Sequence, residues 1–120
     1  MDLEALIREE FRYFESDEQR SAFNAARILP EPFVQSWGYG PPNVHTCLVI
    51  ARDAKTQIVW CATGFGLEAP WSTQAVGALD LGMDSEWDSY LYEAFVCSTM
   101  WPFGPPQGFM RMARGEREPN

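Results

Sequence analysis

The residues best suited to nucleophilic chemistry lie close together in the sequence. His45 is the only histidine, so any Ser-His-Asp or Cys-His device must use it. Cys47 lies two residues further on, on the same face of a predicted strand, and Cys61 or Thr63 lies opposite one of this pair, depending on register. A reactive thiol needs a partly exposed, electropositive setting, whereas this segment is apolar and anionic. We therefore predict buried thiols beside a hydrogen-bonded histidine, and no catalytic residue.

The chain also contains one possible set of zinc ligands, namely His45, Cys47, Cys61 and Cys97. Structural zinc accepts three thiolates and one imidazole. No C-x2-C or H-x3-H spacing holds two of these ligands together locally, so we predict neither a metal nor any other cofactor. An odd number of cysteines without paired spacing also differs from the disulfide framework of small secreted proteins.

Two further patterns have residue types that suit phosphate binding or acid–base chemistry. The segment "TGFGLEAPW", residues 63–71, is glycine-rich and follows a predicted strand, but it lacks the spacings of nucleotide-binding loops and offers no cation. The pairs Asp84/Asp88 and Glu86/Glu93 have the chemistry to exchange protons or bind a hard cation, although no EF-hand pattern is present. Carboxylates at the start of a helix more commonly form its solvated face, so neither pattern predicts a reaction.

Acidic residues are unevenly distributed along the 120-residue chain, whose formal net charge is −8. Residues 1–55 contain nine acids and six bases, and residues 111–120 contain two acids and three bases. Between them, residues 56–110 contain six acids and no Lys, Arg or His. A field of this sign repels phosphates, so we predict no direct binding to nucleic acid. It attracts a basic protein and speeds the encounter, although acidity also serves solubility alone.

The acidic half also carries aromatic residues that suit a protein interface. On the wheel of a predicted helix from residue 84 or 85 to about 100, Glu86, Tyr90 and Glu93 lie opposite the apolar side. A tyrosine between carboxylates offers rigid contact area and charge complementarity to a basic partner. Aromatic residues in loops rich in proline and glycine add contact area at low entropic cost, unless they only fill the core. The predicted partner-binding residues are Trp37, Tyr39, Asp84, Glu86, Asp88, Tyr90 and Glu93.

Two helices are predicted at the N-terminus. Apolar residues at helical spacing predict the first helix over residues 2–15. Glu10 falls inside its apolar stripe, and we expect this carboxylate to reach past the core edge or to pair with an arginine. Ser16 and Gln19 have the capping-box spacing and predict a second helix over residues 17–29, ended by prolines.

The strongest strand signal is a hairpin. Residues 44–52 and 57–63 are β-branched, apolar runs joined by "DAKT". Neither run alternates cleanly with polar residues, so we expect both faces to be covered. Residues 31–43 are predicted to be a packed loop, and residues 78–83 to be a short third strand.

These elements predict an α+β fold in two layers. Two N-terminal helices and one C-terminal helix pack against a small, mostly antiparallel sheet built on the hairpin. Residues 1–112 form the single domain, and residues 113–120 are a frayed tail. No signal peptide or membrane-spanning run is visible, so we expect a cytoplasmic protein with reduced thiols and no membrane partner.

In its size, acidity and lack of a catalytic motif, the chain resembles the immunity proteins that neutralise bacterial toxins. The resemblance involves no aligned motif and therefore transfers no site residue. It implies a stoichiometric protein inhibitor and not an enzyme. The implied partner is a basic protein, such as a nuclease toxin, which the acidic and aromatic surface would occlude.

Two alternatives remain open. The chain fits a small ligand-binding domain or enzyme with a pocket around His45, which is the one histidine. It also fits an accessory subunit that associates with itself through the aromatic loops. The sequence leaves the oligomeric state open between monomer and dimer.

Overall fold

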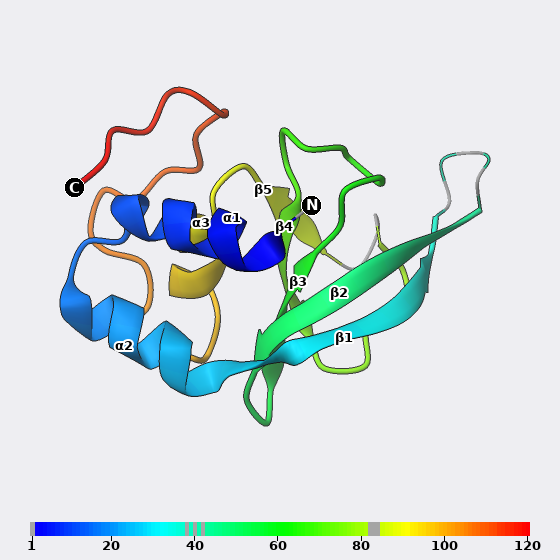
Figure 1. Ribbon diagram of the computed structural model, residues 1–120, viewed down its shortest axis with the longest axis horizontal. Helices are drawn as coiled ribbons and strands as arrows, with labels where there is room; N and C mark the ends of the chain where they lie inside the picture. Colours follow the sequence, from blue (N-terminus) through cyan, green and yellow to red (C-terminus); the bar gives the residue numbers. More distant parts are fainter. Residues whose placement is uncertain (1, 38, 40, 42, 82–84) are drawn as a thin grey trace.

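The chain forms a five-stranded antiparallel sheet with its helices packed on one face, which confirms the predicted α+β fold. The computed structural model describes residues 2–37, 39, 41, 43–81 and 85–120. Figure 1 shows the helices gathered on one side, with the long β1–β2 ribbon extending away from them. The sheet order follows the chain order, and the elements are α1 (Leu3–Glu10), the 3-10 helix η1 (Phe11–Tyr13), α2 (Asp17–Ala26), β1 (Arg27–Ser36), β2 (Val44–Arg52), β3 (Thr56–Trp60), β4 (Trp71–Ala75), β5 (Glu86–Asp88) and α3 (Leu91–Val96).

The N-terminal helices form where the sequence predicts them. α1 continues into η1, and the two together cover most of the predicted first helix. Ser16 caps α2, because its hydroxyl accepts the backbone N–H of Gln19 at 3.2 Å. α2 ends at Ala26, earlier than the predicted end at Leu29, since the chain there enters β1.

The predicted loop over residues 31–43 is wrong in its first part, because β1 continues to Ser36. Pro30 and Pro32 lie inside this strand. Proline cannot donate a hydrogen bond to a neighbouring strand, but β1 lies at the edge of the sheet, where one side of the backbone needs no partner. The two prolines therefore also discourage this edge from pairing with another chain.

The predicted hairpin is confirmed. β2 pairs antiparallel with β3, with Val49 opposite Val59. Asp53 fixes the turn, since its Oδ1 accepts the backbone N–H groups of Lys55 and Thr56, both at 2.9 Å. β3 ends at Trp60, before the end that the sequence predicts.

β4, which pairs antiparallel with β3, was not predicted from the sequence. Ser72 and Gln74 make this strand look too polar for a core, yet both side chains are buried and hydrogen-bonded. A third strand was predicted at residues 78–83, of which the structure describes residues 78–81. In this described part, Asp80 forms an isolated bridge with Ser36.

The predicted helix from residue 84 or 85 to about 100 is wrong over its first half. Residues 86–88 form β5, and α3 begins only at Leu91. Successive side chains of a strand point to opposite faces, so Trp87 packs against the core on the side of the sheet away from the helices. A helical wheel drawn through this segment therefore places its residues on the wrong sides. Asp84 lies outside the described residues.

Two apolar cores lie on opposite faces of the sheet. The larger core joins the helices to the sheet, and aromatic contacts cross it, such as Phe14 stacked on Phe95 with ring centroids 5.3 Å apart. The smaller core, on the second face, is built without any helix residue. Its buried members are Cys47, Val49, Val59, Cys61 and Leu81.

Curvature of the sheet closes the second face. Gln35 on β1 and Gln74 on β4 exchange side-chain hydrogen bonds of 3.1 and 2.9 Å, although β2 and β3 lie between their strands. In a flat sheet, three steps of about 4.8 Å would separate β1 from β4 by roughly 14 Å. The end of β1 curls over to meet the segment after β4, where Ser36 bonds through its backbone to Leu79 and Leu81, both at 2.9 Å.

Candidate functional site

Three of the predicted partner-binding residues are buried. Asp88, Tyr90 and Glu93 are 2%, 0% and 0% exposed. Their prediction as surface contacts is wrong, because the C-terminal segment of the same chain covers them and forms hydrogen bonds with all three. A partner cannot reach these side chains while that segment stays in place.

Three arginines of this segment supply the cations that residues 56–110 lack. Each arginine donates a hydrogen bond to a different buried carboxylate, and the carboxylates belong to α1, β5 and α3. We call these three arginines the arginine clasp. Its ion pairs are Arg111–Asp88 at 2.6 Å, Arg114–Glu10 at 3.1 Å and Arg117–Glu93 at 2.8 Å.

Tyr90 anchors the backbone of the same segment. Its hydroxyl accepts the N–H groups of Gly115 at 2.8 Å and Arg117 at 3.1 Å. Further along, the backbone N–H of Asn120 donates to a carbonyl of η1 at 2.8 Å. The prediction that residues 113–120 form a frayed tail is therefore wrong, because these residues complete the packing around Tyr90.

Burial raises the pKa of two carboxyls in the clasp. Loss of hydration raises the pKa of Asp88 to about 6, against the opposing attraction of Arg111. Burial also raises the pKa of Glu10, against the opposing effects of the Leu91 N–H and Arg114. The expected pairing of Glu10 with an arginine is confirmed. The clasp thus compensates carboxylates whose burial is unfavourable, which is a structural role.

The second face of the sheet ends in a cluster of aromatic rings that we call the aromatic patch. It consists of Trp37, Tyr39, His45, Phe65 and Trp87. Trp37 is central, with its ring centroid 4.9 Å from that of Tyr39 and 5.1 Å from those of His45 and Phe65. Phe65 lies 6.3 Å from Trp87. Tyr39 is 64% and Phe65 is 48% exposed, so the patch presents apolar rings to solvent while ring contacts hold them.

His45 holds the loop after β3 beneath this patch. Its Nδ1 accepts the backbone N–H of Gly64 at 3.2 Å and lies 2.6 Å from the hydroxyl oxygen of Thr63. Nδ1 is therefore the acceptor in the bond to Gly64. Nε2 is buried and has no hydrogen-bond partner among the described residues. The imidazole therefore acts here as a brace between β2 and this loop.

Phe65 is presented by a tight turn flanked by glycines. Gly66 donates its N–H to the carbonyl of Thr63 at 2.6 Å and has a φ of 85°, which glycine adopts without strain. A Cβ on Gly64 would lie 2.9 Å from Cδ2 of the buried Leu81, so a side chain there would require Leu81 to move. The glycines of "TGFGLEAPW" thus serve a turn that points Phe65 outward.

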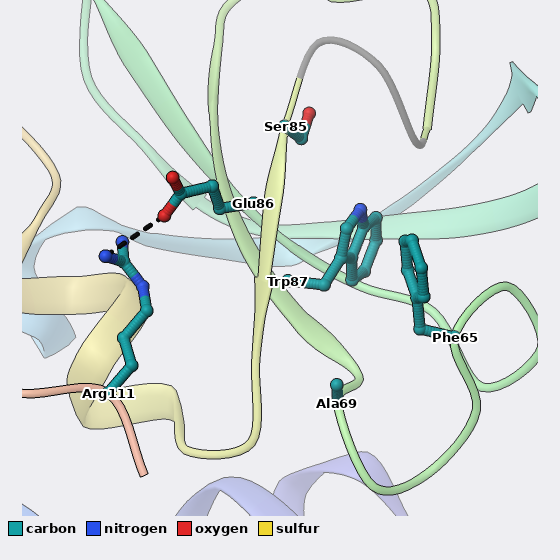
Figure 2. Close-up of a pocket in the computed structure, with 6 residues that line it drawn as sticks. All are labelled: Phe65, Ala69, Ser85, Glu86, Trp87 and Arg111. Carbon is teal, nitrogen blue, oxygen red and sulfur yellow. Dashed lines mark ion pairs between the residues drawn. The ribbon is translucent and has the colours of Figure 1, made fainter. Parts of the chain in front are cut away.

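A hollow of about 300 Å³ adjoins the aromatic patch at β5. Figure 2 shows Trp87 and Phe65 next to each other on one side of β5, while Glu86 on the other side points toward Arg111. Glu86 Oε2 and Arg111 Nη1 are 3.0 Å apart, and the Glu86 side chain is 73% exposed. The hollow therefore combines aromatic walls with a carboxylate that faces solvent. Its lining residues are Phe65, Ala69, Ser85, Glu86, Trp87 and Arg111.

The seven predicted partner-binding residues lie in different places. Trp37 and Tyr39 belong to the aromatic patch, and Glu86 lines the hollow. Asp88, Tyr90 and Glu93 lie under the arginine clasp, and Asp84 lies outside the described residues. Phe65 and Trp87 were not predicted as site residues, although a phenylalanine between two glycines was a signal of an exposed ring.

The four possible zinc ligands are separated by the sheet. Cys47 and Cys61 belong to the smaller core, whereas Cys97 packs against the larger core on the helical face. Across the part of the chain that the structure describes, no three His, Cys, Asp or Glu side chains are grouped as metal ligands would be.

No protein-family model, curated protein or solved structure matches this chain. Within the described ranges, every helix is too short or too polar to cross a bilayer. The site is therefore interpreted from its own geometry.

Asp88 provides a test of the clasp through pH. A carboxyl whose pKa is higher in the folded than in the unfolded chain binds its proton more tightly when folded, so stability rises as pH falls through that pKa. Between about pH 7.5 and about pH 5.5, wild type should gain roughly 1 kcal/mol of unfolding free energy relative to Asp88→Asn. Urea unfolding at each pH measures this difference. A difference that stays constant or shrinks would contradict the raised pKa of Asp88.

His45 provides a test of the loop brace. His45→Ala removes the acceptor for the Gly64 N–H, so we expect a loss of about 1–2 kcal/mol in stability. The Gly64 amide should exchange its hydrogen at least roughly tenfold faster, measured by NMR. Val44→Ala, at the exposed neighbouring position, should leave that exchange rate unchanged. Equal Gly64 exchange in wild type and His45→Ala would show that the imidazole does not hold this loop.

Proposed function

We propose that this chain is a protein-binding module that engages a basic partner protein through the aromatic patch and the adjoining hollow. The observation that carries the proposal is the exposure of rings that are already fixed. Tyr39 and Phe65 are largely exposed, yet each packs edge-on against Trp37. Clustered exposed apolar surface is typical of interaction sites, and aromatic residues are enriched at the centres of protein interfaces.

Preorganisation supports a binding role for the patch. The turn around Gly66 and the bond from Gly64 to His45 hold the Phe65 loop in place without a partner. A surface whose side chains are already ordered loses less conformational entropy on association. The rings therefore suit the central anchors of an interface, where few residues supply most of the binding energy.

Charge around the hollow favours a basic partner. Among the predicted acidic contacts that the structure describes, Glu86 is exposed, and Glu68 is exposed in the loop that carries Phe65. Arg111 lies closer to Asp88, at 2.6 Å, than to Glu86, at 3.0 Å, so Glu86 can accept a cation from a partner while Arg111 keeps its buried pair. Lys and Arg side chains of a partner suit this chemistry, because the hollow offers aromatic rings on one side of β5 and the Glu86 carboxylate on the other.

A stoichiometric inhibitor is the form of this function that the sequence resemblance favours. In that form the chain neutralises a basic toxin, such as a nuclease, by covering its active site or the surface beside it. The support for this narrower proposal is the chain's acidity and its fixed, exposed rings. Inhibition of the captured partner in a one-to-one mixture is the measurement that separates an inhibitor from a simple adaptor.

Affinity capture from the source lysate, followed by reconstitution with the purified partner, tests the proposal. Phe65→Ala and Glu86→Lys should each weaken binding to the purified partner by roughly tenfold or more, because they remove an anchor and reverse a complementary charge. Leu29→Ala and Glu18→Lys change exposed residues on β1 and α2 and should bind within about twofold of wild type. Binding should also slow as salt rises from about 50 mM to about 500 mM.

Two outcomes would contradict the proposal. Wild-type affinity in both Phe65→Ala and Glu86→Lys would remove the patch and the hollow as the binding site. A wild-type chain that forms dimers in sedimentation experiments, and becomes monomeric on Phe65→Ala, would instead assign the patch to self-association.

A further inference from the structure

Two cysteines face each other across the hairpin of β2 and β3. Leu48 on β2 pairs with Trp60 on β3, so the next antiparallel pair along the ladder is Cys47 and Cys61. Both side chains belong to the smaller core, which places them on the same face of the sheet. The two thiols are free and are 0% and 1% exposed.

The backbone geometry of this pair suits a disulfide. Cys61 donates its N–H to the carbonyl of Pro70 at 2.9 Å, on the side of the strand away from β2. Relative to β2 it therefore occupies a non-hydrogen-bonded position, where facing Cα atoms lie about 4.5 Å apart. Disulfides span Cα separations of about 4.4–6.8 Å, so the strands need little movement to accept the bond.

The two sulfurs have different surroundings, which suit them to different steps of an oxidation. The hydrogen bond between the thiols lowers the pKa of Cys61 to about 5 and raises the pKa of Cys47. Cys61 Sγ also lies 3.6 Å from the hydroxyl oxygen of Thr63, whereas Cys47 Sγ is directed at Gln35 Oε1 at 3.8 Å. Cys61, whose pKa is lowered and whose sulfur adjoins the Thr63 hydroxyl, is therefore the better nucleophile of the two, and Cys47 is the thiol that can resolve its oxidised form.

Access to Cys61 comes from the loop after β3. Thr63, two residues away, is exposed, and Gly64 has no side chain to cover the sulfur. A Cβ at Gly64 would lie 2.9 Å from Cδ2 of the buried Leu81 and 3.7 Å from Cys61 Sγ, so this loop must move before an oxidant reaches the sulfur. An oxidant that reaches the sulfur by this route must be small.

We propose that Cys47 and Cys61 form a redox-reactive pair that a peroxide converts into a cross-strand disulfide. The Cys61 thiolate attacks one peroxide oxygen, the O–O bond breaks, and hydroxide leaves as Cys61 becomes a sulfenic acid. Cys47 then attacks the Cys61 sulfur, the S–S bond forms, and the sulfenic oxygen leaves as water. In total, two thiols and one hydrogen peroxide give one disulfide and two waters, so the thiols lose two electrons and the peroxide gains them. This site is independent of the proposed partner.

Hydrogen peroxide treatment of the folded chain, followed by non-reducing peptide mapping, tests the proposal. We expect a linkage between the peptides that contain Cys47 and Cys61, and its loss on reduction with dithiothreitol. In Cys47→Ala the sulfenic acid on Cys61 has no resolving thiol, so labelling of Cys61 by dimedone should rise at least roughly tenfold over wild type. Cys61→Ala should show no comparable labelling of Cys47. Cys97→Ala is the matched control, because this thiol lies on the other face and burial raises its pKa.

Folding controls keep the result interpretable. Circular dichroism should show that each alanine variant keeps the wild-type fold, and Cys47→Ser serves as a second resolving-thiol variant if Cys47→Ala does not fold. Oxidation confined to Cys97 would overturn the proposal. A Cys47–Cys61 linkage that appears only in urea would also overturn it, because the site would then belong to the unfolded chain.

Discussion

A carboxylate removed from water needs a compensating cation, and this requirement connects the distant parts of the chain. Glu10, Asp88 and Glu93 come from α1, β5 and α3, and one short C-terminal segment supplies an arginine to each. Glu10 also accepts the backbone N–H of Leu91 at 2.9 Å, so the same carboxylate positions the start of α3. Breaking a buried ion pair by removing one partner commonly costs about 3–5 kcal/mol, more than the pair itself contributes over apolar packing. The clasp therefore specifies how these elements meet more than it adds net stability.

The two faces of the sheet differ in what covers them. The helical face carries the larger core and the clasp, and its aromatic residues are mostly enclosed. The second face has no helix cover, and curvature of the sheet closes most of it through the Gln35–Gln74 hydrogen bonds. What curvature does not enclose is the aromatic patch at the end of this face. Exposed rings on this face, such as Phe65, can therefore change without disturbing the helical core.

Local signals predicted much of the fold, and longer-range effects account for the errors. The hairpin, the Ser16 cap and the arginine pairing of Glu10 follow from strand patterning, capping chemistry and the rule against unpaired buried charge. β5 could not be predicted from local signals, because three residues carry too little periodicity to reject a helix. Its conformation is fixed by its pairing with β4. Trp37, Tyr39 and Glu86 could be proposed as surface residues from their loops and charge. The burial of Asp88, Tyr90 and Glu93 could not be predicted, because it depends on arginines more than 20 positions away in the sequence.

The position of the clasp in the sequence bears on when the chain can fold during translation. Arg117 enters the ribosomal exit tunnel long after Glu10, and synthesis proceeds from the N-terminus at roughly 5–20 residues per second. Until Arg117 emerges, Glu93 has no cation, and the site around it favours hydration over burial. The helices near the N-terminus can form early, but the larger core cannot close with all its charges matched. The charge of Glu93 is therefore matched only after Arg117 has left the tunnel.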